Sequence, residues 1–148
     1  MSEETVSVLI VEDEEPIRAL LVYVLNPSFQ CLTAETAGEA IALLDRMSFN
    51  IILADVGLPG MSGIELCRRA IEKSPATAVI IISGKGEVEL VIEAIEAGAF
   101  DFILKPFDLS QVMDTVVQAL NRDSIDRPSS RAREWLQAIR NEKSKLTA

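Results

Sequence analysis

Residues 51–63 read IILADVGLPGMSG, and this stretch carries the strongest signal for the fold class. Its first four residues, 51–54, are apolar, as expected for a strand that is buried on both faces of a parallel sheet. Ser62 then begins a capping-box pattern with Glu65, which is typical of a helix N-terminus. Asp55 lies between the two, directly after the strand. The stretch therefore predicts a buried strand, a loop that starts with a carboxylate, and a helix.

Short apolar runs and amphipathic segments alternate on both sides of this stretch. The five runs that we predict as strands are 6–11, 30–34, 51–54, 78–82 and 100–104. An amphipathic segment follows each run; in the first, apolar residues recur at i, i+3, i+4, i+7 and i+8 between Ile17 and Leu25, which places them on one helical face. Asp108 is expected to cap the last of these five helices. The alternation predicts a doubly wound α/β fold with a parallel sheet.

The charge balance changes towards the C-terminus. Residues 1–120 carry a net charge of −12, whereas residues 121–148 carry +3. Residues 121–131 are polar and lack an apolar stripe, which predicts a linker. We therefore expect one domain over residues 1–121 and a separate unit over residues 122–148.

The last part of the chain has a helical periodicity of its own. Between residues 132 and 146, one side carries Trp135, Leu136 and Ile139 and the basic residues fall largely elsewhere. This pattern predicts a short amphipathic helix, a C-terminal extension of the fold. Its lone tryptophan is expected to pack on its own domain or on a symmetry-related copy. The segment is either the start of a linker to a further domain or the natural end of the chain.

The composition excludes several classes of protein. The 148 residues are 49% hydrophobic and contain no histidine, which excludes histidine triads and histidine-containing zinc sites. The formal net charge of −9 would repel a nucleic acid or an anionic membrane. No apolar stretch reaches the ~18 residues of a membrane span, and Cys31 and Cys67 have no metal-ligand or disulfide pattern. We expect a cytoplasmic protein that binds neither nucleic acid nor membrane directly.

Polar residues follow four of the predicted strands. They are Glu12 and Asp13 after the first, Asp55 after the third, Ser83 after the fourth and Lys105 after the fifth. We expect them to gather at one edge, because ligands of parallel α/β sheets bind at the carboxyl ends of the strands. Two unit charges ~4 Å apart interact by ~4 kcal/mol at an effective dielectric of 20, so three converging carboxylates need a cation. Mg²⁺ suits these oxygen ligands, and the set suits phosphoryl transfer with Asp55 as nucleophile.

Four motifs extend this pattern along the chain. They are VEDEE at 11–15, ADVGLPGMSG at 54–63, IISG at 81–84 and GAFDFILKPF at 98–107. Over residues 5–121 they resemble the receiver domain of two-component response regulators. The resemblance implies a flavodoxin-like five-stranded sheet of order 2-1-3-4-5. It also implies a signalling protein that takes a phosphoryl group from a partner histidine kinase, catalyses only its own phosphorylation and dephosphorylation, and turns over no free metabolite.

The resemblance also assigns a phosphoacceptor and a metal site. It makes Asp55 the phosphoacceptor, which would become an aspartyl phosphate. Asp13 and Asp55 would bind Mg²⁺ directly, Glu12 would act through a water molecule, and Gly57 would contribute its backbone carbonyl. Because Gly57 leaves the site open to water, we expect the phosphoryl lifetime to differ from that of relatives with a bulky residue there.

A conformational switch is implied as well. The hydroxyl of Ser83 would turn to bond a phosphoryl oxygen, and Lys105 would be followed by a cis peptide at Pro106. Phe102 matches the switch aromatic and would move into the space that Ser83 vacates. The readout would be the surface of the fourth helix, fifth strand and fifth helix, where such domains commonly dimerise or meet an output module. The stretches around 81–107 resemble those of regulators with large C-terminal output modules, which favours a missing output domain.

Other interpretations stay open from the sequence. Asp55 taken alone could be a turn residue, and Phe102 could be an ordinary core residue. An aspartate-nucleophile phosphatase would use the same chemistry, but Gly57 stands where its second aspartate is expected. A nucleotide or flavin module would need a neutral phosphate cradle after the first strand, where residues 12–15 are all acidic. A pseudo-receiver, which binds partners without phosphorylation, usually lacks site residues that this chain keeps.

Overall fold

The computed structural model describes residues 5–122 and 128–147. The strands are β1 Ser7–Val11, β2 Gln30–Ala34, β3 Ile51–Asp55, β4 Ala78–Ser83 and β5 Asp101–Leu104. They form one parallel sheet in the order β2-β1-β3-β4-β5. This order confirms the predicted doubly wound α/β fold, in which β1 and β3 lie side by side.

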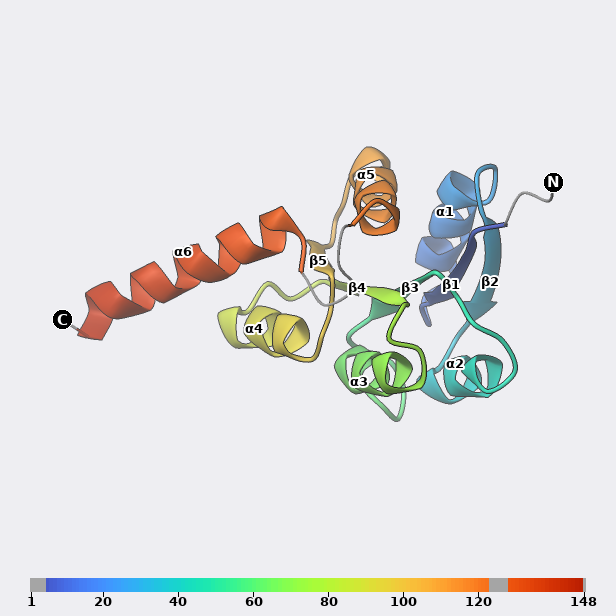
Figure 1. The fold of residues 1–148 in the computed structure, drawn as a ribbon, viewed down its shortest axis with the longest axis horizontal. Helices are drawn as coiled ribbons and strands as arrows, with labels where there is room; N and C mark the ends of the chain where they lie inside the picture. The colour runs from blue at the N-terminus through green and yellow to red at the C-terminus, as the bar shows by residue number, and fades with distance from the viewer. Residues whose placement is uncertain (1–4, 123–127, 148) are drawn as a thin grey trace.

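Helices cover both faces of the sheet. They are α1 Glu15–Leu25, α2 Ala37–Leu44, α3 Gly63–Lys73, α4 Val88–Glu96 and α5 Leu109–Leu120. Figure 1 shows α1 and α5 on one face and α2, α3 and α4 on the other. Each face has its own apolar core, and all residues of β3 and β4 are buried. Burial on both faces explains why these strands read as nearly continuous apolar runs.

The predicted helix caps are present at α2 and α3. The hydroxyls of Thr36 and Ser62 accept hydrogen bonds from the amides of Glu39 and Glu65, at 3.1 and 3.2 Å. Asp108 is the N-cap of α5, but its side chain makes no capping hydrogen bond, contrary to the prediction. Its backbone carbonyl accepts the first helical N–H bonds instead, and its charge still suits the positive end of the helix dipole.

Strands β3 and β4 each end one residue later than predicted, so that the site residues Asp55 and Ser83 belong to the strands. Asp55 pairs with Ile82 in the β3–β4 ladder, and Ser83 pairs with Leu104 in the β4–β5 ladder. The amide of Lys105 also donates to the carbonyl of Ser83 at 2.8 Å. The sheet itself therefore holds the backbones of Asp55 and Ser83 in place.

A close approach between β3 and α3 explains one glycine of the central motif. A Cβ atom on Gly63 would lie 2.1 Å from the carbonyl oxygen of Asp55, and the amide of Gly63 donates to the carbonyl of Val56 at 3.0 Å. No side chain fits at that distance, so only glycine allows α3 to start directly beneath Asp55.

The C-terminal extension is the helix α6 Ser130–Thr147. It starts two residues earlier than predicted, so Ser130 and Arg131 belong to the helix and not to the linker. The earlier start has a local cause, since the hydroxyl of Ser129 accepts the amide of Ala132 at 2.9 Å as an N-cap. Of the rest of the predicted linker, residues 123–127 lie outside the described part of the chain. Among the described helices, none is long and apolar enough to cross a membrane.

The first half of α6 packs against β5 and α4. Ala132 and Ile139 are buried in the same apolar cluster as α3 and α4, and Trp135 packs on its own domain, one of the two predicted placements. Figure 1 shows that α6 starts beside β5 and that its C-terminal end points away from the sheet. Residues 128–139 therefore extend the core at the β5 edge, while the predicted boundary near residue 121 stays a prediction.

Candidate functional site

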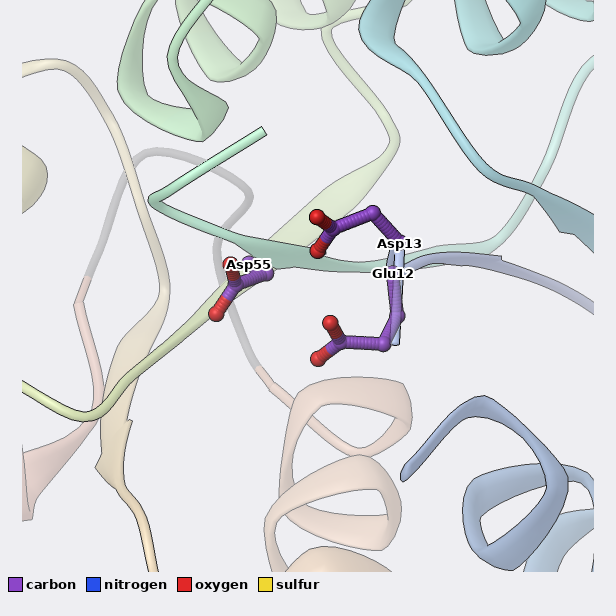
Figure 2. Close-up of side chains that lie close together, drawn as sticks. All are labelled: Glu12, Asp13 and Asp55. Atoms are coloured by element: carbon purple, nitrogen blue, oxygen red, sulfur yellow. The ribbon is translucent and has the colours of Figure 1, made fainter. Parts of the chain in front are cut away.

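Three carboxylates gather at the carboxyl ends of β1 and β3. Oxygens of Glu12, Asp13 and Asp55 lie within 4.8 Å of one another, and Figure 2 shows the three side chains close together, with Glu12 and Asp13 directed towards Asp55. Glu12 is 1% exposed and Asp55 is 8% exposed, whereas Asp13 is exposed. The β1–β3 pairing brings the three groups together, and solvent reaches the cluster on the side of Asp13.

Lys105 brings a positive charge into this cluster. Its Nζ lies 2.9 Å from Oε1 of Glu12 and 2.9 Å from Oδ1 of Asp55. The loop after β5 carries it there, and the peptide bond between Lys105 and Pro106 is cis. One ammonium cannot neutralise three carboxylates, so the cluster keeps a net negative charge.

Burial and charge shift the ionisation of two of these groups. Burial raises the pKa of Glu12, because removal from water penalises its charged form, and the neighbouring Asp55 charge acts in the same direction. Burial opposes the ammonium of Lys105, but its contacts with Glu12 and Asp55 outweigh this effect and raise its pKa. Lys105 therefore stays charged. The negative charge of Glu12 is only partly offset by its contact with Lys105.

Backbone groups fix the orientation of two carboxylates. The amide of Gly57 donates to Oδ2 of Asp55 at 3.0 Å, and the amide of Glu14 donates to Oε2 of Glu12 at 3.1 Å. Arg18 Nη1 donates to the carbonyl of Glu12 at 2.9 Å, which secures the turn after β1. Sequence reasoning missed Arg18, because its role depends on a backbone carbonyl six residues away.

The cluster fits a hard divalent cation. Its donors are carboxylate oxygens, which Mg²⁺ prefers, and a net negative charge surrounds them. The buried Oε1 of Glu12 lies 2.9 Å from Nζ of Lys105, the ammonium that Glu12 shares with Asp55. A carboxylate that shares its cation with a second carboxylate is available to a further cation or to its bound water. The structure brings Gly57 beside Asp55, while the role of its carbonyl stays a prediction.

The two predicted switch residues lie on the same face of the sheet. Ser83 is buried, and its hydroxyl accepts the amide of Lys85 at 3.0 Å. Phe102 is fully buried, and its ring meets that of Trp135 edge to face. The structure therefore has Phe102 in an inward position with α6 against it, a contact that no sequence pattern indicated.

The chain matches a known family over most of its length. The sequence profile of the "Response regulator receiver domain" family matches residues 8–117. The chain is 36% identical over 126 residues to the hydrogenase transcriptional regulatory protein HoxA of Cupriavidus necator, and the match covers 84% of this chain and 26% of that protein. It is 39% identical over 118 residues to the transcriptional regulatory protein ResD of Bacillus subtilis, covering 79% of this chain and 49% of that protein. The chain thus spans half or less of each of these two relatives.

Solved structures of similar chains have the same fold. The BeF₃-activated DrrB receiver domain matches with a TM-score of 0.76 and 29% identity, covering 80% of this chain and 100% of that one. A CheY-like receiver domain protein from Methanospirillum hungatei matches with a TM-score of 0.77 and 28% identity, covering 80% and 95%. Sheet order, profile and relatives agree: this chain belongs to the response regulator receiver domain family.

Proposed function

We propose that the chain accepts a phosphoryl group on Asp55 from the phosphohistidine of a partner histidine kinase, in a reaction that needs Mg²⁺. The observation that carries the proposal is the single lysine that contacts Glu12 and Asp55 at 2.9 Å while Asp13 completes the acidic cluster. This arrangement supplies a nucleophilic carboxylate, one fixed cation and oxygen ligands for a second cation. Phosphoryl transfer needs these parts, because it depends on positioning and on neutralising charge.

The chemical step uses Asp55 as the nucleophile. One of its carboxylate oxygens forms the new P–O bond, the P–N bond to the donor imidazole breaks, and the imidazole nitrogen keeps the electron pair. Lys105 stays within reach of the phosphoryl oxygens and offsets part of their charge. The amide of Gly57, 3.0 Å from Oδ2, keeps the carboxylate oriented. The chain modifies only itself and turns over no free metabolite.

Mg²⁺ would be held by Asp13 and Asp55 directly, by Glu12 through water and by the carbonyl of Gly57. Its chemistry would be to neutralise the phosphoryl oxygens as Asp55 attacks. The sharing of the one Lys105 ammonium between Glu12 and Asp55 supports this role. Ionised carboxylates are required, so the raised pKa of Glu12 makes metal binding weaker in mildly acidic solution.

The phosphoryl group would be read through Ser83. It adds roughly −2 charge and new acceptor oxygens, which favour rotation of the Ser83 hydroxyl away from the Lys85 amide and towards the site. Phe102 then packs into the vacated space, and the surface of α4, β5 and α5 changes. We propose that this surface forms a homodimer or meets an output domain, to which residues 122–148 would lead.

The deciding experiment is intact mass after incubation with acetyl phosphate and Mg²⁺. We expect a gain of one phosphoryl group in the wild type and none in Asp55→Ala. Asp114→Ala, which removes an exposed carboxylate from α5, is the matched control and should gain the group normally. A phosphoryl group that persists in Asp55→Ala would place the acceptor elsewhere. No gain in the wild type, with or without a kinase, would favour a pseudo-receiver.

A further inference from the structure

The helix α6 is docked on the side of the sheet that carries the switch residues. Ala132 and Ile139 are buried, and Trp135 and Leu136 are partly buried against the same cluster as Phe102. The helix contacts β5 and α4, and Figure 1 shows its first turns beside β5. The spacing of these four residues gives α6 one apolar face directed at the domain.

An ion pair between Asp101 and the partly exposed Arg131 anchors the start of α6. Asp101, the first residue of β5, is fully buried. Its Oδ2 accepts the hydroxyl of Ser129 at 2.9 Å, and its Oδ1 lies 3.0 Å from Nη2 of Arg131. The amide of Ser129 also donates to the carbonyl of Phe100 at 2.8 Å. Because a buried charge without its partners is costly, these bonds hold the helix start at one place on β5.

Trp135 lies directly against the switch aromatic. The ring centroids of Trp135 and Phe102 are 5.9 Å apart and the rings are inclined by 83°, the edge-to-face arrangement that aromatic pairs favour. The guanidinium carbon of Arg131 lies 5.7 Å from the centroid of the Trp135 ring, within the range of a cation–π contact. The Phe102 ring in its inward position is therefore part of the surface against which α6 packs.

Phe102 and the site residue Ser83 lie on the same face of the sheet. In the β4–β5 ladder Phe102 pairs with Ile81, and Leu104 pairs with Ser83. Residues two apart in a strand point to the same side, so Ser83, Leu104 and Phe102 share one face. Leu104 also packs against the loop after Ser83, since a Cβ atom on Gly86 would lie 3.0 Å from its side chain. The loop after Ser83 therefore contacts Leu104 on the face of the sheet that Phe102 shares.

We propose that α6 is the element that reads the state of Asp55, and that docking of Trp135 and phosphorylation of Asp55 favour one another. The inference rests on the proposed function. A phosphoryl group that draws Ser83 inward favours the inward Phe102, and the inward Phe102 provides the edge-to-face partner of Trp135. By linkage, a contact that favours the inward state must raise the affinity for the phosphoryl group in equal measure.

The test measures the affinity for beryllofluoride, a phosphoryl mimic, by calorimetry in the presence of Mg²⁺. Trp135→Ala should weaken binding about fivefold or more, at the lower end of ordinary coupling. Trp135→Phe keeps an aromatic edge and should bind within about twofold of the wild type. Gln137→Ala, on the exposed side of α6, is the control and should leave the affinity unchanged. Circular dichroism verifies that each variant is folded.

A second measurement uses the wild type alone. Trp135 is the only tryptophan, so its fluorescence reports on α6 without a label. Beryllofluoride with Mg²⁺ should lower the quenching of Trp135 by acrylamide, and Asp55→Ala should show no such change. The proposal is overturned by equal affinity in Trp135→Ala and wild type, by tighter binding in Trp135→Ala, or by increased quenching on binding. If wild type binds no beryllofluoride and gains no phosphoryl group, the proposed function fails and this inference with it; binding without any effect of Trp135 overturns the inference alone.

Discussion

Buried carboxylates lie at both ends of β5, and the two sites differ in how many partners each carboxylate has. At its start, Asp101 accepts from the Phe102 amide, the Ser129 hydroxyl and Arg131, so one carboxylate has one cation and several donors. Beyond its end, Lys105 faces Glu12 and Asp55, with Asp13 close by. The first carboxylate has its own cation and several donors, whereas the second site holds excess negative charge, with one ammonium shared between two buried carboxylates.

The difference separates a structural role from a functional one. A carboxylate whose partners are all supplied by the chain stabilises one conformation. A carboxylate cluster with too few cations and donors destabilises the folded protein. Binding of a ligand that supplies the missing partners then raises the stability. The same strand thus joins an anchor for α6 to a site that we expect to respond to Mg²⁺ and a phosphoryl group.

The largest effect is expected from Asp101→Ala. It leaves the Ser129 hydroxyl and the Phe102 amide without their acceptor in a buried place and should lower the free energy of unfolding by about 2 to 3 kcal/mol. Denaturant unfolding measures the loss, with Asp114→Ala expected to stay within about 0.5 kcal/mol of wild type. A loss as small as that of the control would mean that the anchor contributes little and would break the contrast between the two sites.

The opposite response is expected from Asp13→Asn. It should stabilise the metal-free protein slightly, by about 0.5 kcal/mol, because an exposed repulsive charge is removed. At the same time it should weaken Mg²⁺ binding about tenfold or more. Denaturant unfolding in EDTA and calorimetric titration with MgCl₂ test the two halves. Unchanged Mg²⁺ affinity would remove Asp13 from the metal site.

A smaller effect is expected at Gly57. A Cβ atom there would lie 3.4 Å from Oδ2 of Asp55, an ordinary contact, so a side chain fits without displacing the phosphoacceptor. Gly57→Arg should cover the approach of water and slow dephosphorylation about threefold, while Gly57→Ala should leave the rate close to wild type. Intact mass followed over time gives both rates, and an unchanged rate in Gly57→Arg refutes the expectation.

The smallest effect is expected from pH. Burial raises the pKa of Glu12 above its model-compound value of 4.5, so the folded state keeps this proton while the unfolded state has lost it. The metal-free protein should therefore lose stability from Glu12 as the pH rises from 4.5 through the raised pKa. The difference in unfolding free energy between wild type and Glu12→Gln isolates this contribution. A difference that is flat with pH, or that rises, contradicts the assignment; saturating Mg²⁺ should reduce the slope.

Local pattern was sufficient for much of the fold. Strand burial could be predicted from the apolar runs of β3 and β4, and two helix starts from the caps at Thr36 and Ser62. Both features depend on neighbours within a few residues. The sheet order required a resemblance between motifs, because periodicity contains no information on which strands pair. The gathering of Glu12, Asp13 and Asp55 was predictable once strand ends were assigned to one edge.

Other features depend on contacts across long sequence separations. Gly63 is required by the backbone of Asp55, a clash that no spacing rule contains. The pair of Asp101 and Arg131 spans 30 residues, and Asp101 in the sequence is only a polar residue at a strand edge. This pair holds the start of α6 against β5, and Trp135 meets Phe102 one turn further along the helix.

By itself, then, the sequence determined the alternation of elements and the chemistry available at the strand ends, because both arise from residue type and short-range spacing. Tertiary structure alone decided which carboxylates are satisfied and which are not, and that α6 rests on the switch aromatic. The reason is physical: burial and hydrogen-bond partners are properties of the folded arrangement, and here they join β5 to segments far along the chain.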